Sequence, residues 1–109
     1  MKEITSASAL ITEMNHAKGN LVVLDFYAPW CGPCKTLGPV LEKMQSKYPS
    51  VTFLKINADT ETELTTQYNI SALPTVIVFK KSGQKWGVVS IVKGCNPSAI
   101  EKILQENSA

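Results

Sequence analysis

Two cysteines, Cys31 and Cys34, are the residues best suited to do chemistry, and they are separated by Gly32 and Pro33. Side chains three residues apart in the first turn of a helix lie on the same side, so the two sulfur atoms can form a small disulfide ring. A helix N-terminus also stabilises a thiolate, because its unpaired N–H groups carry partial positive charge. The pair is therefore predicted to be a reversible dithiol with a thiolate that acts as a nucleophile.

The two cysteines stand where a predicted strand passes into a predicted helix. Residues 21–27 form a short and largely apolar run, which is typical of a buried strand. Apolar residues then recur at helical spacing, at Leu37, Val40, Leu41 and Met44. Pro33 suits the start of this helix, because the N–H that it lacks would have no partner in the first turn.

Two other interpretations of the cysteine pair compete with redox chemistry. A zinc site would need four ligands, usually in two pairs, and the remaining candidates, His16 and Cys95, form no second pair. The other alternative is an inert pair of buried thiols. We therefore predict redox chemistry and no metal site.

Asp25 is the only charged residue in the apolar run 21–27. Burying a carboxylate costs free energy, so a buried Asp25 must be explained by a structural or a functional role. One interpretation is a structural pair with a cation. The other is a desolvated acid of raised pKa beneath the dithiol, which exchanges a proton with Cys34.

The remaining elements are predicted from periodicity and from turn and capping residues. We expect an edge strand in residues 1–5, and a helix that is capped by Ser6 and ends near Gly19. A strand over 51–56 and a helix opened by a capping box at 60–63 follow. The last elements are a strand over 76–79, a turn over 80–84, a strand over 86–93 and a helix with Asn96 as cap and Pro97 first.

Composition and charge exclude several classes of function. The 109 residues suffice for one domain, and the formal net charge is only +2. All eleven basic residues are lysines, scattered along the chain, which does not favour nucleic-acid binding. No apolar run has the length of a membrane span or of a signal peptide, so we expect a cytoplasmic protein.

The segment Trp30-Cys31-Gly32-Pro33-Cys34-Lys35, after a strand with a lone Asp, resembles the thioredoxin family of disulfide reductases. The predicted order of strands and helices resembles that family over essentially the whole chain. The resemblance implies an α/β fold, with a central mixed five-stranded sheet flanked by four helices in a single domain over 1–109. It also places the dithiol at the carboxyl end of a strand, where open α/β sheets have their sites.

The resemblance assigns roles to four residues of the reaction centre. Cys31 is expected to be the exposed, attacking thiol, and Cys34 the shielded, resolving thiol. Asp25 is expected to exchange a proton with Cys34 through water, and Lys55 on the neighbouring strand is expected to tune Asp25.

Further residues are expected to bind the substrate. By resemblance, Pro74 follows a cis peptide bond and packs against the disulfide, while the backbone of Leu73 pairs with a substrate strand. Without the resemblance, Pro74 would be a plain loop proline. Trp30, Gly32, Pro33 and Gly94 complete the expected surface, although Trp30 could instead pack in the core.

Cys95 is a third thiol, in a loop that borders the substrate groove of the family. It is either a regulatory thiol, able to form an intermolecular disulfide or to be glutathionylated, or a passive free cysteine. The segment from Phe79 to Gly94 is a few residues longer than in typical thioredoxins, so its hairpin is expected to be extended or bulged.

The resemblance implies a thiol-disulfide oxidoreductase that carries electrons and is recycled by thioredoxin reductase and NADPH, with no redox cofactor bound to this chain. It implies peroxiredoxin, ribonucleotide reductase and methionine sulfoxide reductase as clients, with no nucleic acid or membrane as partner. The protein is expected to be a monomer, with a dimer linked through Cys95 as a further form. Two alternatives stay open: a disulfide oxidase or isomerase, in which Gly-His usually separates the cysteines, and a non-catalytic binding module.

Overall fold

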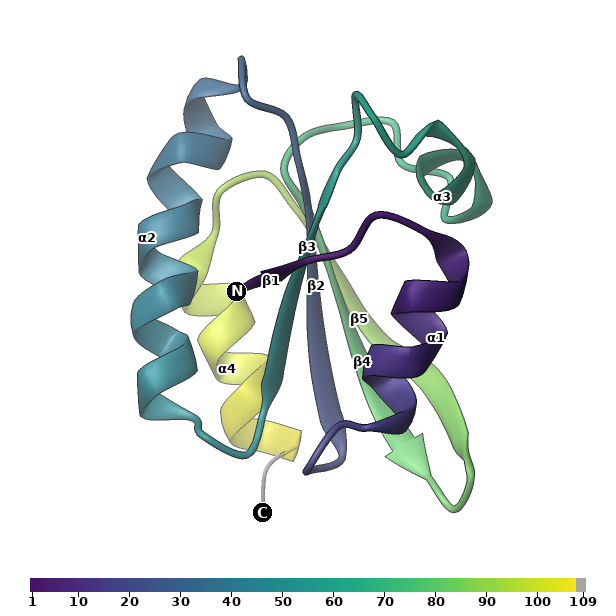
Figure 1. Cartoon of the computed structure of the whole chain (residues 1–109). Coiled ribbons are helices and arrows are strands. Elements are labelled where there is room, and N and C mark those ends of the chain that lie inside the picture. Colours follow the sequence, from purple (N-terminus) through teal and green to yellow (C-terminus); the bar gives the residue numbers. More distant parts are fainter. Residues whose placement is uncertain (108–109) are drawn as a thin grey trace.

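A five-stranded mixed sheet runs through the centre of the computed structural model, which describes residues 1–107 (Figure 1). The strands are β1 (Lys2–Glu3), β2 (Leu21–Tyr27), β3 (Thr52–Asn57), β4 (Thr75–Ser82) and β5 (Lys85–Lys93); the helices are α1 (Ala7–Asn15), α2 (Gly32–Lys47), α3 (Thr62–Gln67) and α4 (Pro97–Asn107). Strand order is β1-β3-β2-β4-β5, in which β4 is antiparallel to both its neighbours and the other pairs are parallel. The predicted mixed sheet with four helices is confirmed for these residues.

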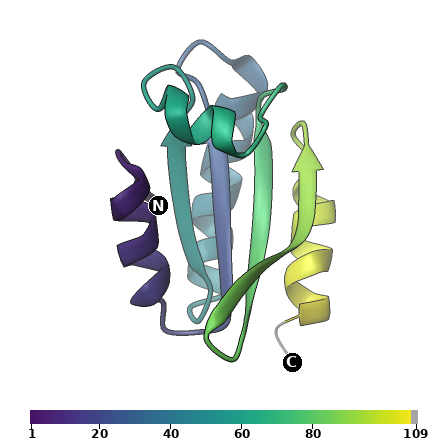
Figure 2. The same ribbon diagram turned by 90° about the vertical axis from the view of Figure 1, so that its right-hand side faces the viewer.

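The helices form two layers, with α2 and α4 on one face of the sheet and α1 and α3 on the other (Figures 1 and 2). Each layer closes a separate apolar core. Leu37, Leu41 and Ile100 pack with one face of the sheet, and Leu10 and Leu64 pack with the other. None of the helices within residues 1–107 is both long enough and apolar enough to cross a membrane.

Strand β2 lies in the middle of the sheet and supplies both cores. Its side chains alternate between the two faces, so Val23 packs under α2 and α4 while Leu24 and Phe26 pack under α1 and α3. Asp25 therefore points to the face that α2 covers. Because β2 runs directly toward α2, its carboxyl end places the cysteines beside this buried carboxyl group.

Two of the predicted helix starts are confirmed in detail. The hydroxyl oxygen of Ser6 accepts the N–H of Ala9 at 3.0 Å, and the side-chain oxygen of Asn96 accepts the N–H of Ala99 at 3.2 Å. Each bond satisfies an N–H group that has no partner within its helix.

The predicted capping box at the start of α3 is wrong. This helix begins at Thr62, and its cap residue, Glu61, makes no side-chain capping bond. The Thr60 hydroxyl instead donates to the backbone carbonyl of Asn57 at 3.3 Å. The Thr60 hydroxyl thus bonds within the turn that follows β3, and α3 begins two residues later without a side-chain cap.

The end predicted for α1 is also wrong, because the helix stops at Asn15 and His16 is its cap. Gly19 has no role in ending the helix. A Cβ atom at this position would collide with the backbone carbonyl oxygen of Ser50. Tertiary packing, which local sequence does not reveal, is thus the reason for this glycine.

The hairpin of β4 and β5 is both extended and bulged, as the length of its segment predicted. Strand β4 continues through Lys80 and Lys81, which were expected to form the turn, and the turn is instead made at Gly83 with φ +63°. Val78 pairs with Ser90 but Phe79 pairs with Val88, so Val89 is the extra residue of a bulge. This bulge, with lysines at both ends of β5, makes the exposed apolar edge of the sheet a poor template for further strands.

Substituting Gly19 by Ala tests the packing against Ser50. We expect Gly19→Ala to lower the free energy of unfolding by about 1–3 kcal/mol, because either the backbone or residue 50 must move. The matched control is Gly87→Ala, where an added Cβ meets open space, and its effect on urea unfolding should be close to zero. Equal stability of the two variants would contradict this explanation.

Candidate active site

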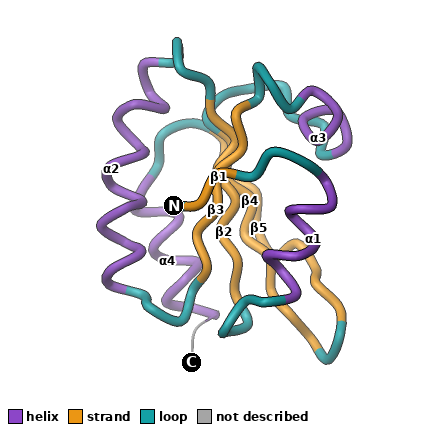
Figure 3. The backbone as a smooth tube through the Cα atoms, viewed as in Figure 1, coloured by secondary structure: helices purple, strands orange, loops and turns teal. Residues whose placement is uncertain are grey.

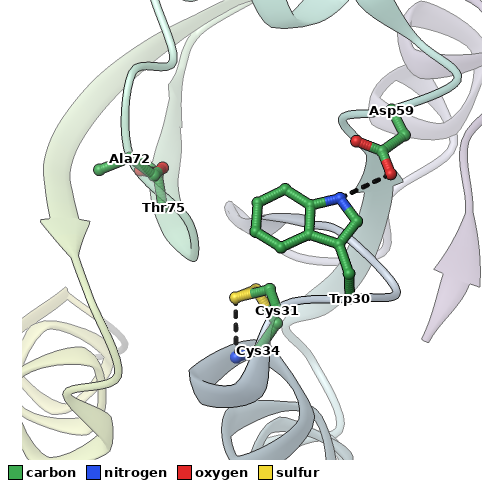
Figure 4. Close-up of a disulfide and its surroundings, with 6 residues drawn as sticks. All are labelled: Trp30, Cys31, Cys34, Asp59, Ala72 and Thr75. Carbon is green, nitrogen blue, oxygen red and sulfur yellow. Dashed lines mark hydrogen bonds between the residues drawn. A yellow bond between two sulfur atoms is a disulfide. The ribbon is translucent and has the colours of Figure 1, made fainter.

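Cys31 and Cys34 form a disulfide at the N-terminus of α2, with their Cα atoms 5.3 Å apart (Figure 4). Cys31 is the cap residue of the helix, and its Sγ atom accepts the backbone N–H of Cys34 at 3.2 Å. Pro33 lies in the first turn, where its missing N–H costs nothing. The Cys34 N–H that bonds to this sulfur would also stabilise a thiolate on Cys31 once the disulfide is reduced.

The predicted contrast in exposure between the two cysteines is absent from this oxidised form. Cys31 is 4% exposed and Cys34 is 5% exposed, so Cys31 is not the exposed thiol that the resemblance implied. The reason is packing, because both cysteines form one apolar cluster with Ala28, and Tyr27 and Leu73 pack against it. Gly32 and Pro33 between them are exposed.

Trp30 covers one side of the disulfide and is held in place by a hydrogen bond. Its indole Nε1 donates to Oδ2 of Asp59 at 2.8 Å, and its side chain is 68% exposed, which rules out simple core packing (Figure 4). Asp59 was missed in the sequence analysis. Its position just after β3 was a usable signal, because β2 and β3 are parallel and their following loops leave the same edge of the sheet (Figure 3).

The loop before β4 lies on the other side of the disulfide. The Leu73–Pro74 peptide bond is cis, as predicted, and Leu73 packs against the two cysteines. Two hydrogen bonds fix this loop, from the Thr75 hydroxyl to the carbonyl of Ala72 at 2.6 Å and from the N–H of Gly94 to the carbonyl of Pro74 at 2.8 Å. Gly94 has φ +84°, a conformation that favours glycine.

An open groove of about 260 Å³ passes between Trp30 and this loop. Its lining comes from segments that follow β2 and β3 and precede β4: Trp30, Ala58, Thr65, Ile70, Ser71, Ala72 and Leu73. The backbone of an extended peptide could lie here beside the disulfide, because the lining is mostly small and apolar.

Asp25 lies behind the dithiol, in a second pocket of about 560 Å³ that Cys34, Tyr27 and Lys55 also line. The residue is 2% exposed and its Oδ1 atom has no hydrogen-bond partner. Burial raises the pKa of Asp25 from an ordinary 3.8 to about 7, and the positive charge of Lys55 opposes part of this rise. A carboxyl group with such a pKa can hold or accept a proton at neutral pH.

The remaining predicted residues are divided between the site and the surface. Cys95 is an exposed free thiol that follows Gly94, and the N–H of Gly94 bonds to the carbonyl of Pro74 in the cis-proline loop. His16 lies at the end of α1, away from the dithiol. Within residues 1–107, no group of three or more His, Cys, Asp or Glu side chains is placed to hold a metal ion.

The disulfide lies at a helix cap and faces a cis-proline loop, on a sheet with the strand order given above. A disulfide in this position can be reduced and re-formed by exchange with other thiols and disulfides. The class of protein that this fold and this site define is the protein disulfide oxidoreductases. The family model for thioredoxin matches residues 3–106. The chain therefore belongs to the thioredoxin family.

Individual relatives agree with this assignment. Thioredoxin-1 of Saccharomyces cerevisiae is 39% identical over 92 residues, which cover 84% of this chain and 85% of that protein. The peptide-N(4)-(N-acetyl-beta-glucosaminyl)asparagine amidase of Caenorhabditis elegans is 40% identical over 108 residues, 97% of this chain. The chain spans only 17% of the length of that amidase.

Solved structures show the same fold. Trichomonas vaginalis thioredoxin superimposes with a TM-score of 0.90 at 28% identity, with 97% of this chain and 96% of that chain covered. A second structure superimposes with a TM-score of 0.83 at 30% identity, with 97% of this chain and 94% of that chain covered. It comes from work on the thiol resolving mechanism of yeast mitochondrial 1-Cys peroxiredoxin through the glutathione and thioredoxin systems.

The buried carboxyl group predicts how stability depends on pH. The pKa of Asp25 is higher in the folded than in the unfolded protein. The contribution of its protonated form to the stability of the fold is therefore complete below about pH 4, and it is lost as the pH rises through about 7. In the oxidised protein, Asp25→Asn should match the wild type near pH 4. At pH 8 it should be more stable by an amount of order 4 kcal/mol, measured by urea unfolding.

The control substitution is Glu63→Gln, which removes an exposed carboxylate and should give no comparable gain. Parallel stability curves for Asp25→Asn and wild type over this pH range would contradict the burial argument.

Proposed function

We propose that this protein reduces disulfides in other proteins by dithiol-disulfide exchange through Cys31 and Cys34. The single observation that carries the proposal is the position of the Cys31 sulfur, which caps α2 and lies in disulfide contact with Cys34. The cap favours the thiolate on Cys31, and the contact allows Cys34 to expel whatever Cys31 has captured.

The exchange takes place in two balanced steps. The Cys31 thiolate attacks one sulfur of the target disulfide, forms a mixed disulfide, and releases the other target sulfur as a thiolate. The Cys34 thiolate then attacks Cys31, which re-forms the Cys31–Cys34 disulfide and frees the second target thiolate. Two electrons pass to the target, and two protons complete its thiols.

Asp25 assists the second step in this proposal by accepting the proton of the Cys34 thiol. The two residues line the same pocket behind the dithiol, and the pKa of Asp25, about 7, suits proton exchange at neutral pH. Lys55 limits the rise in the pKa of Asp25 and so keeps the carboxyl group from being too weak an acid.

The client polypeptide binds in the open groove beside the disulfide. Trp30 offers an exposed apolar face on one side, and the loop at Leu73 and Pro74 offers backbone groups on the other. Gly32, Pro33 and Gly94 let the client backbone approach the sulfur atoms closely. We place peroxiredoxins, ribonucleotide reductase and methionine sulfoxide reductases among the clients, and the peroxiredoxin study among the structural neighbours supports the first of these.

Each turnover leaves the dithiol oxidised, so the cycle needs two electrons from elsewhere. We propose that a thioredoxin reductase supplies them from NADPH, and that the chain itself binds no redox cofactor. A monomer in the reducing cytoplasm fits this role, because such a compartment keeps client thiols reduced. Cys95 is proposed as an additional thiol that links two copies under oxidation.

Insulin reduction with NADPH and a thioredoxin reductase tests the function. The wild type should precipitate insulin chains and consume NADPH, whereas Cys31→Ser and Cys34→Ser should fall to the uncatalysed rate. Cys34→Ser should in addition accumulate a mixed disulfide with the client, because Cys31 attacks but nothing releases the product.

Cys95→Ser is the matched control, since it removes a thiol outside the dithiol and should keep full activity. Full insulin reduction by Cys31→Ser would defeat the proposal. Wild-type protein that oxidised reduced substrates but failed to reduce insulin would instead identify a disulfide oxidase.

A further inference from the structure

Lys55 stands between two carboxylates in a single row across three neighbouring strands. It is the register partner of Glu3 on β1 and of Asp25 on β2. Register partners on adjacent strands lie about 4.8 Å apart and present their side chains to the same face. The ammonium group of Lys55 therefore has a carboxylate on the strand at either side and could pair with one or the other.

The two carboxylates differ sharply in their surroundings. Glu3 is exposed, whereas Asp25 is buried and its Oδ1 atom has no hydrogen-bond partner. Within residues 1–107, no ion pair joins Lys55 to Asp25. The nearest cation in the register thus leaves the buried acid unpaired.

The Lys55 ammonium lies over the ring of Tyr27, with its Nζ atom 5.6 Å from the ring centroid. Tyr27 follows Asp25 by two residues on β2, so both side chains are on the face that α2 covers. An aromatic face attracts a cation without stripping away its water, whereas pairing with a buried carboxylate would require desolvation of both ions. Lys55 therefore lies at the ring, and within residues 1–107 it forms no ion pair with Glu3 either, so the Glu3 carboxylate attracts it only at a distance.

We propose that Glu3 and Tyr27 are positioning residues that hold the Lys55 ammonium away from Asp25. Held in this way, Lys55 acts on Asp25 only at a distance, and the buried carboxyl group can still carry a proton near neutral pH. The consequence for disulfide exchange rests on the proposed function, but the placement of Lys55 does not.

The other charged groups at this pocket come from α2 and from the start of the chain. Helix α2 contributes Glu42 and Lys43, with the uncharged disulfide sulfur of Cys34 beside them, and the amino group of Met1 is paired with Glu42 at 2.9 Å. The α2 carboxylate is therefore already occupied by another cation and does not compete for Lys55.

The titration behaviour of the neighbouring groups agrees with this arrangement. Burial raises the pKa of Asp25 to about 7 despite the opposing charge of Lys55. Burial also raises the pKa of Tyr27 to about 12, followed by the hydrogen bond of its hydroxyl to Glu3 and the negative charges of Glu3 and Asp25. The ring of Tyr27 is thus neutral throughout the working range and offers Lys55 its aromatic face.

The direct test is the titration of Asp25 in the oxidised protein, followed by the carboxyl carbon chemical shift in NMR spectra from about pH 4 to about pH 10. In Tyr27→Leu and in Glu3→Gln, Lys55 should move to Asp25, and the midpoint should fall by about 1 pH unit. Tyr27→Phe keeps the ring but loses the hydroxyl that bonds to Glu3, so its midpoint should fall by less than that of Tyr27→Leu. Glu3→Gln alters an exposed side chain, so the test does not depend on how well Tyr27→Leu folds.

The same substitutions in a Lys55→Met background separate positioning from direct charge effects. If Glu3 and Tyr27 act through Lys55, neither substitution should shift the Asp25 midpoint once Lys55 is gone. A shift that persists in Lys55→Met, or unchanged midpoints in both Tyr27→Leu and Glu3→Gln, would overturn the inference.

This readout is independent of catalysis, so a protein inactive toward insulin could still confirm the placement of Lys55. Where insulin reduction is observed, the acid limb of its pH profile should move to lower pH in Tyr27→Leu and Glu3→Gln. The shift in Tyr27→Phe should be smaller than in Tyr27→Leu, because the ring is kept and only the bond to Glu3 is lost.

Discussion

The structure depends on the burial of strand β2 on both of its faces. Six consecutive residues of this central strand are buried, so a polar group placed in it loses most of its hydration. Asp25 is that group, and its raised pKa follows from its position in the sheet. The same strand points at the N-terminus of α2, where the Cys31 sulfur caps the helix. A protonatable acid and a stabilised thiolate are thus produced beside each other by one strand and one helix start.

Much of this arrangement was predictable because it is local in sequence. The apolar run of β2, the Gly-Pro spacer between the cysteines and the helical spacing after Cys34 are all contiguous. The structure has the strand over the predicted residues 21–27 and a helix that begins directly after Cys31. Ser6 and Asn96 were also correct as caps, because a cap needs only an N–H two or three residues away. The cis bond before Pro74, by contrast, came from family resemblance, since a lone X-Pro pair carries no such information.

The errors have a common physical origin, which is contact between residues far apart in the chain. Gly19 looked like a helix end, but its small size is required by the carbonyl of Ser50. Thr60 looked like a cap, but its hydroxyl is used by the turn after β3. Asp59 bonds to Trp30 and Glu3 lies in register with Lys55, and neither relation is visible before the strands are ordered. Exposure of Cys31 was mispredicted for the same reason, because Leu73, forty residues away, packs against it in the oxidised form.

The site also shows why a buried acid can be kept in a small protein. A carboxyl group that is neutral costs the folded state far less than a carboxylate, so the energetic burden of Asp25 appears only when it loses its proton. In the exchange reaction Asp25 would be a carboxylate only until it takes the proton of the Cys34 thiol, and the negative charge would then pass to the Cys34 sulfur. A firm ion pair with Lys55 would remove this coupling, because it would fix Asp25 as a carboxylate and make it a weaker proton acceptor. The open contact of Lys55 with Tyr27 avoids that outcome while keeping a positive charge near enough to moderate the acid.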